Sequence, residues 1–155
     1  MHVFFYGTLM CGFSLRRRSD IESFLRFSGR GSVQGLLYDL GSYPGMVAGR
    51  GTVVGELYEI LQADRLLPKL DAIEGYYPNA PDKSSYLRRR GRVRHFDGVN
   101  VSSWVYVFNG TLEKASRILS GDYAAHVSHS EVDRGLFFPE EKAWQRRKSF
   151  IKRYC

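Results

Sequence analysis

Three carboxylates near the middle of the chain could transfer protons. Glu56 lies within residues 52–60, where apolar and polar residues alternate as in a strand, and its neighbours on the same face are apolar. Asp71 and Glu74 belong to a helical pattern that ends at Gly75, which places Glu74 at the C-terminal end of a helix. An apolar setting raises the pKa of a carboxyl group toward neutrality, where it serves best as acid and base. All three residues are therefore candidates for acid–base chemistry.

A short turn after the first predicted strand could bind a ligand through its backbone. Residues 2–7 are typical of a strand, and Gly7 with Thr8 then forms a turn that lets a ligand approach the main chain closely. Free N–H groups in such a turn can bind a carboxylate without a charged side chain. A plain hairpin turn is the alternative interpretation of Gly7.

Other familiar catalytic signatures are missing from the sequence. It contains no G-x-S-x-G elbow, no Walker loop and no H-E-x-x-H helix. His126 and His129 could hold a metal if Glu131 or Asp133 supplied a third ligand, but a solvated helix face is the simpler interpretation. The two cysteines lack the C-x-x-C spacing of a thiolate metal site. We therefore expect no metal and no organic cofactor.

The elements that must position these residues fit an α+β domain. The pattern predicts a capping box and a helix over about 15–27, a helix over 64–74, a short helix over 111–119 and a final basic helix that starts at Pro139. Asp97-Gly98 is a hairpin-type turn between two strands that we expect to pair antiparallel. The predicted strands are residues 2–7, 33–38, 52–60, 85–95 and 101–109.

Composition indicates one folded domain with a basic surface. The 155 residues are 43% hydrophobic and 14% aromatic, and the formal net charge is +7. Arginine clusters at 16–18, 88–94 and 146–153 could bind nucleic acid, or they could keep the protein soluble and steer an anionic substrate. No nucleic-acid recognition motif accompanies them, so we expect no nucleic-acid partner. No stretch approaches the roughly 20 apolar residues of a membrane span, and without a secretory signal we expect a cytoplasmic protein.

Several short motifs, in their order and spacing, resemble one known family. It is the γ-glutamyl cyclotransferase superfamily, which includes the γ-glutamylamine cyclotransferases and the AIG2-like proteins, and the resemblance covers about residues 3–125. The motifs are Tyr6-Gly7-Thr8-Leu9, Gly41-Ser42-Tyr43-Pro44-Gly45, Gly55-Glu56-Leu57-Tyr58, Leu70-Asp71-Ala72-Ile73-Glu74-Gly75-Tyr76, Tyr86, Trp104-Val105-Tyr106-Val107 and Ser120-Gly121-Asp122-Tyr123.

The resemblance implies a fold, a reaction and a set of site residues. The fold would be a mixed β-barrel flanked by helices, and the reaction would convert a γ-glutamyl amine or peptide into 5-oxoproline and the free amine. Glu74 would be the catalytic base and acid, with Asp71 structural. Glu56 would contact the substrate amine or support the site from behind. The γ-glutamyl group would be bound by Tyr6, Gly7, Thr8 and Leu9. From the sequence itself, Tyr43, Tyr86 and Tyr106 are candidate pocket hydroxyls, or alternatively core residues whose hydroxyls reach water.

Two departures limit what the resemblance implies. Many relatives carry a basic residue and a Gly soon after the Tyr-Gly-Thr-Leu turn, whereas this chain has Met10 and Cys11 before Gly12. We expect a single domain over 1–155, in which residues 126–155 form a basic C-terminal helical extension outside the resemblance.

Two alternative functions stay open, a non-catalytic small-molecule-binding module of the same fold and a basic nucleic-acid adaptor.

Overall fold

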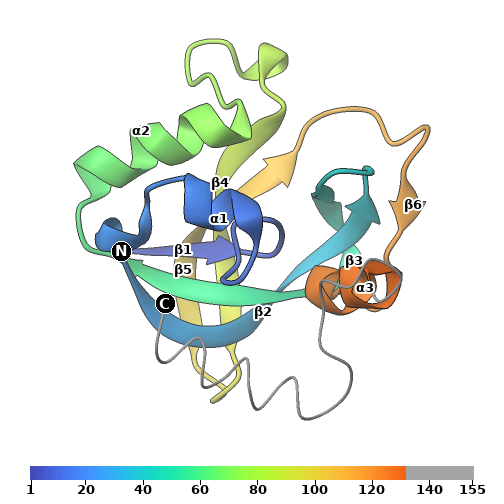
Figure 1. Cartoon of the computed structure of the whole chain (residues 1–155), viewed down its shortest axis with the longest axis horizontal. Coiled ribbons are helices and arrows are strands. Elements are labelled where there is room, and N and C mark those ends of the chain that lie inside the picture. The colour runs from blue at the N-terminus through green and yellow to red at the C-terminus, as the bar shows by residue number, and fades with distance from the viewer. Residues whose placement is uncertain (132–155) are drawn as a thin grey trace.

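The structure is a computed structural model and describes residues 1–131. Five strands close into a mixed β-barrel in the order β3–β1–β5–β4–β2, with β2 pairing back onto β3 (Figure 1). Only β1 and β5 are parallel neighbours, and the other pairs are antiparallel. The strands are β1 (His2–Phe5), β2 (Leu25–Asp39), β3 (Pro44–Ile60), β4 (Tyr86–His95) and β5 (Asn100–Phe108). The sequence prediction of a mixed barrel is confirmed.

A long β2–β3 hairpin provides much of the curvature. Its register shifts between Phe27 and Gly29 and again between Gln34 and Leu36, and such irregularities bend and coil a strand pair. Barrel closure between β2 and β4 is short, because the two strands pair only at Gly31 with His95 and at Ser32 with Arg94. Beyond Ser32 the register between β2 and β4 does not continue.

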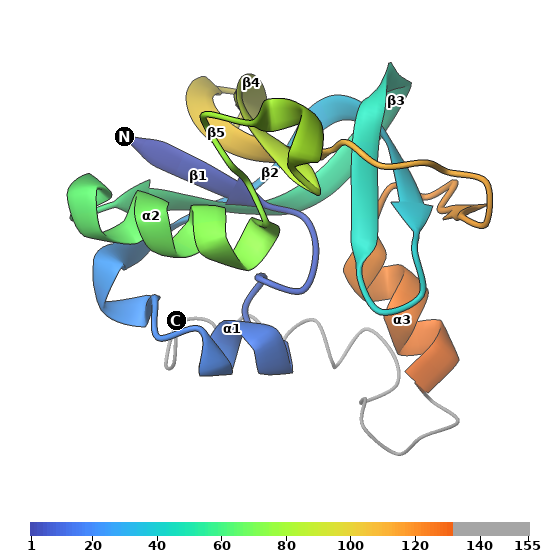
Figure 2. The ribbon, with the colours of Figure 1, turned by 90° about the horizontal axis from the view of Figure 1, so that it is seen from above.

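Helices and short elements complete the fold around the barrel. Helix α2 lies beside β1, as both views show (Figures 1 and 2). Strand β6 pairs with the end of β2. The remaining elements are α1 (Ser14–Arg18), η1 (Glu22–Phe24), α2 (Ala63–Glu74), η2 (Pro81–Lys83), β6 (Ser116–Arg117) and α3 (Tyr123–Glu131). In the part of the chain that the structure describes, no helix is long and apolar enough to cross a membrane.

Helix α2 faces the core with a stripe that includes its last residue. Leu66 and Leu70 are fully buried, and Glu74 follows Leu70 by four residues, so it lies on the same helix face. Gly75 ends the helix in the left-handed backbone conformation, with φ 60°. Glycine adopts this conformation more easily than any other residue, which is why it is common just after the C-terminus of a helix. The predicted helix over 64–74 and its glycine stop are confirmed.

Two helix predictions are wrong. Residues 15–27 form only the short α1 and η1 before β2 begins at Leu25, because Asp20 adopts φ 49° between them and breaks the helical path. Residues 111–119 contain strand β6 instead of a helix, and the Ile118 N–H donates to the Leu37 carbonyl at 2.8 Å. Edge pairing with β2 therefore outweighs the local helical pattern there.

The C-terminal predictions are only partly covered by the structure. Helix α3 includes the start of the expected extension over 126–155. The helix predicted from Pro139 lies outside the described residues, so the extension stays a prediction. The cytoplasmic location likewise stays a prediction.

Candidate active site

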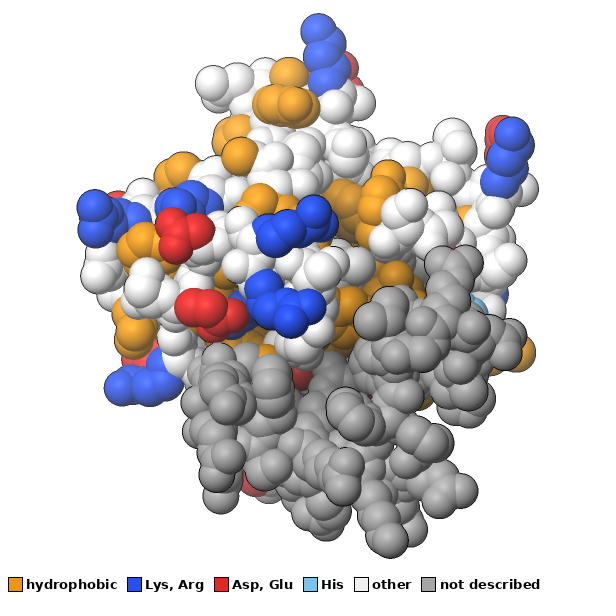
Figure 3. Space-filling view, viewed as in Figure 1, with side chains coloured by type: hydrophobic (Ala, Val, Ile, Leu, Met, Phe, Trp, Pro, Cys, Tyr) orange, Lys and Arg blue, Asp and Glu red, His pale blue; other side chains and the backbone are white. Residues whose placement is uncertain are grey.

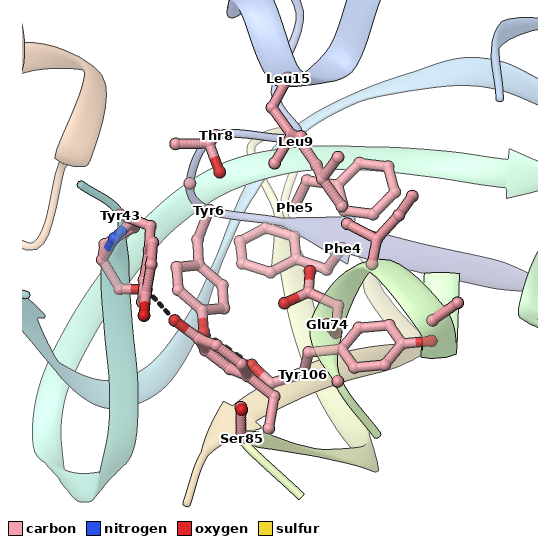
Figure 4. Close-up of a pocket in the computed structure, with 16 residues that line it drawn as sticks. Phe4, Phe5, Tyr6, Thr8, Leu9, Leu15, Tyr43, Glu74, Ser85 and Tyr106 are labelled. Carbon is pink, nitrogen blue, oxygen red and sulfur yellow. Dashed lines mark hydrogen bonds between the residues drawn. The ribbon is translucent and has the colours of Figure 1, made fainter. Parts of the chain in front are cut away.

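A cavity of about 240 Å³ opens beside the C-terminal end of α2. It is called the Glu74 cavity below, and Figure 4 shows its lining. The walls come from β1, the loop after it, the β2–β3 turn, the end of α2 and the start of β4. The lining residues are Phe4, Phe5, Tyr6, Gly7, Thr8, Leu9, Leu15, Tyr43, Pro44, Ala72, Ile73, Glu74, Gly75, Ser85, Tyr86 and Tyr106.

Among residues 1–131, Glu74 is the only carboxylate in this lining, and no Lys, Arg or His of this range belongs to it. Its carboxyl group points into the cavity among the aromatic rings of the lining (Figure 4). Burial raises the pKa of Glu74 to about 8, because few water molecules are left to solvate the charged form. The helix dipole places partial negative charge at the C-terminal end of α2, and this charge also raises the pKa of Glu74. Glu74 therefore holds its proton at neutral pH in the empty site.

Three buried tyrosines form walls of the cavity and have protein partners for their hydroxyls. The Tyr6 hydroxyl donates to the Tyr106 carbonyl at 2.7 Å, and the Met46 N–H donates to it at 3.3 Å. The Tyr86 hydroxyl donates to the Pro44 carbonyl at 2.7 Å. Burial raises the pKa of Tyr6, Tyr86 and Tyr106 above the ordinary value. These groups stay protonated and fix the shape of the cavity.

Asp71 holds α2 against the barrel from outside the cavity. One of its carboxylate oxygens accepts the Tyr106 hydroxyl at 2.7 Å, and the other lies 3.0 Å from Nη1 of Arg88. Asp71 is not part of the cavity lining. It links α2 to β4 and β5, and this link fixes the position of Glu74 one turn further along the helix.

The loop after β1 presents backbone donors to the cavity. A turn closes where the Met10 N–H donates to the Gly7 carbonyl at 2.9 Å. Within residues 1–131, no acceptor takes the N–H groups of Thr8 and Leu9. A Cβ on residue 7 would lie 2.6 Å from Cγ of Pro44, so the close packing of this proline requires Gly7. The glycine is needed for space and not for a positive φ, because Gly7 is absent from the glycines with positive φ.

Glu56 and Arg16 anchor this loop from behind. Oε2 of Glu56 accepts the Cys11 N–H at 2.7 Å and the Tyr58 hydroxyl at 2.9 Å. Nη1 of the buried Arg16 donates to the Leu9 carbonyl at 3.0 Å. Glu56 is buried and lies outside the cavity lining, so it positions the loop.

The structure brings together most of the residues that the sequence indicated. Glu74 and the predicted substrate-binding residues line one cavity, with Glu56 as the exception. The exposed Tyr43 lies at the cavity and packs edge-on against Tyr86. Sequence reasoning missed Ser85 and Leu15 as lining residues. Ser85 precedes a strand without a motif of its own, and Leu15 was assigned to a longer helix.

The metal hypothesis at His126 and His129 stays untested, because Asp133 and the side chains of His129 and Glu131 lie outside what the structure describes. The described residues contain no group of three potential ligands close enough to hold an ion. His126 pairs with Asp39, whose Oδ2 lies 2.8 Å from Nε2 of the imidazole.

The fold and the site define a small closed barrel with a half-buried carboxyl group in its cavity, and known proteins share this fold. The family model of the gamma-glutamyl cyclotransferase, AIG2-like proteins matches residues 3–125. A Vibrio cholerae protein, named provisionally as a gamma-glutamylcyclotransferase, is 33% identical over 126 residues, which are 81% of this chain and 96% of that protein.

Solved structures show the same architecture. The Escherichia coli protein YtfP is 32% identical with a TM-score of 0.55, and the match covers 82% of this chain and 99% of YtfP. An AIG2-like protein from Mus musculus is 27% identical with a TM-score of 0.58, over 72% of this chain and 80% of that one. The chain belongs to the gamma-glutamyl cyclotransferase, AIG2-like family.

Proposed function

We propose that the protein is a γ-glutamyl cyclotransferase that converts a γ-glutamyl amine or peptide into 5-oxoproline and the free amine. The observation that carries this proposal is the half-buried carboxyl group of Glu74, whose pKa is raised to about 8 in a cavity that contains no cation among the described lining residues. A group of this kind gains and loses a proton near neutral pH, as general acid–base catalysis requires. Family membership supports the reaction class.

The cavity suits a small zwitterionic group. The unpaired N–H groups of Thr8 and Leu9 would bind the α-carboxylate of the substrate. The α-ammonium would then lie toward Glu74, where an ammonium and a carboxylate stabilise each other. A volume of about 240 Å³ is small for a ligand site. It would hold the γ-glutamyl group, and the leaving amine would extend toward the opening.

The reaction needs one proton carrier and a fixed geometry. The Glu74 carboxylate takes a proton from the α-ammonium, and the freed amine attacks the γ-carbonyl carbon and closes a five-membered ring. The bond from this carbon to the leaving nitrogen then breaks as Glu74 returns the proton to that nitrogen. Glu74 next takes the second proton that the ring nitrogen must lose and passes it to the released amine, which departs as an ammonium ion. Both reacting groups belong to one molecule, so fixing their relative position supplies a large part of the rate enhancement. Glu74 ends in the state in which it began.

The reaction can be tested with matched pairs of substrates. A panel of γ-glutamyl amines, γ-glutamyl dipeptides and γ-glutamyl isopeptides is incubated with the full chain, and 5-oxoproline is quantified by mass spectrometry. Each substrate is paired with its α-N-acetyl derivative, which has no free amine to attack. We expect 5-oxoproline and free amine in equal amounts from one class of free substrate, and none from its acetylated partner. Release of glutamate would identify a hydrolase, and binding without product would identify a binding module.

A further inference from the structure

A second, larger cavity of about 860 Å³ lies where β2 and β4 separate beyond their short pairing at Ser32. It is called the arginine groove below. Its lining comes from β2, β3, β4 and β5 and shares no residue with the Glu74 cavity. Apolar side chains contribute to the lining, namely Val33, Met46, Val47, Ala48, Val105 and Val107. The proposed cyclotransferase reaction makes no use of this groove.

Five arginines and no acidic residue of the described part of the chain line the groove. Arg50 comes from β3, and the other four are Arg89, Arg90, Arg92 and Arg94 on β4. None of the five forms an ion pair with a carboxylate among residues 1–131, whereas Arg88 on the same strand pairs with Asp71. On the face shown in Figure 3, by contrast, several Lys and Arg side chains lie next to Asp or Glu. Strand alternation places Arg90, Arg92 and Arg94 on one face of β4 and Arg89 on the other, so positive charge without a carboxylate partner lies on both sides of the groove at this strand. These charges repel one another, and an anion would relieve this repulsion.

The arrangement of the arginines suits several phosphate groups. Arg90, Arg92 and Arg94 alternate along β4, so their Cα atoms follow one another at about 6.6 Å. The guanidinium carbon of Arg90 lies 3.8 Å from the ring centre of Trp104, which holds that group in place. Arg50 comes from a different strand. Planar guanidinium groups bind phosphate through two parallel hydrogen bonds.

We propose that the arginine groove binds a nucleoside polyphosphate, with the phosphates on the arginines and the base on the apolar part of the lining. The uncharged polar residues Gln34, Thr52 and Asn100 are available to hydrogen-bond the sugar or base. The volume falls within the range of small-molecule sites, about 300–1,000 Å³. A free nucleotide fits better than a nucleic-acid strand, because single-strand binders stack successive bases on aromatic side chains and the groove lining contains none.

Calorimetric titration of the full chain tests this site. The ligands are ATP, inorganic pyrophosphate and a short oligothymidylate, each at low and at raised salt. The test variant is Arg50→Gln with Arg92→Gln, and the control is Arg17→Gln with Arg18→Gln, which removes the same charge from exposed positions on α1. Thermal unfolding of both variants checks that they fold.

We expect ATP to bind more tightly than pyrophosphate, with an affinity that falls as salt rises. The test variant should weaken ATP binding about tenfold or more, and the control should bind like the parent. The proposal is overturned if ATP does not bind at millimolar concentration or if both double variants behave alike. If pyrophosphate binds as tightly as ATP, the base does not contribute to binding and the nucleoside part of the proposal is wrong. If the oligothymidylate binds more tightly than ATP, the ligand of the groove is a nucleic-acid strand and not a free nucleotide.

Discussion

The Glu74 cavity and the arginine groove lie in one small barrel and have opposite electrostatic character. Counting the residues that the structure describes, the first contains one carboxyl group and no cation, and the second contains five arginines and no acid. The chain carries a net charge of +7, yet the pKa of Glu74 is raised to about 8, with burial as the cause. Local desolvation therefore outweighs the overall positive charge, which by itself would favour the carboxylate.

Two arginines that help to position the walls of the Glu74 cavity pair with carboxylates of their own. Arg88 pairs with Asp71 at 3.0 Å, and Arg16 pairs with Glu22 at 2.6 Å. The cavity thus keeps its proton carrier without a competing charge, while the groove keeps its arginines available. The predictions below test whether this division matters for activity and stability.

The largest effect is expected from Glu74→Gln. Gln has the shape of Glu and can still form hydrogen bonds, but it cannot accept the ammonium proton. We expect kcat to fall by roughly 10²–10⁴-fold with ligand binding retained, measured as steady-state release of 5-oxoproline. Glu113→Gln, at an exposed position, is the matched control and should behave like the parent. Parental turnover by Glu74→Gln would remove Glu74 from the mechanism.

The next effect concerns the backbone donors of the loop. Gly7→Ala would place a Cβ 2.6 Å from Cγ of Pro44 and displace the turn from the cavity. We expect KM for the γ-glutamyl substrate to rise about tenfold or more. The double variant Gly7→Ala with Pro44→Ala removes the colliding atoms and should recover most of the affinity. If both variants keep the parental KM, the loop does not bind the substrate.

Much of the site could be predicted from the sequence because it depends on local patterns. Helical spacing from Leu66 and Leu70, together with the stop at Gly75, placed Glu74 at the end of a core-facing helix. The strand alternation likewise indicated that Glu56 is buried. It did not show what lies next to Glu56, because the loop at Cys11 is distant in sequence and meets β3 only in the folded barrel.

What the sequence did not show depends on such long-range contacts. The run from Arg88 to Arg94 gives no sign that Arg88 pairs with Asp71 while its neighbours line a groove, since that distinction depends on how far along β4 helix α2 reaches in the folded barrel. The left-handed Asp20 divided a predicted helix. Residues 111–119 have a helical pattern, but pairing of Ser116 and Arg117 with β2 decides their conformation.

A smaller effect is expected on stability, again from Glu74→Gln. The folded protein keeps the Glu74 proton up to about pH 8, whereas the unfolded chain loses it near the ordinary pKa of 4.5. The parent therefore loses stability as pH rises from 4.5 to 8, and Gln does not titrate. We expect the variant to have a free energy of unfolding higher by roughly 1–3 kcal/mol at pH 8, and about equal at pH 4.5. Urea denaturation at the two pH values measures this, and a less stable variant at pH 8 would contradict the burial of the charge.

The pH dependence of kcat/KM tests the central claim most directly, because kcat/KM reports the ionisation of groups in the free enzyme. The competent form of the free enzyme has Glu74 deprotonated. We therefore predict that kcat/KM rises about tenfold per pH unit on the acid side and levels off above about pH 8, the pKa of the Glu74 carboxyl group. This acidic limb should be absent from the residual activity of Glu74→Gln. A limb near the ordinary pKa of 4.5, or one that persists unchanged in Glu74→Gln, would contradict the assignment of Glu74 as a desolvated proton carrier.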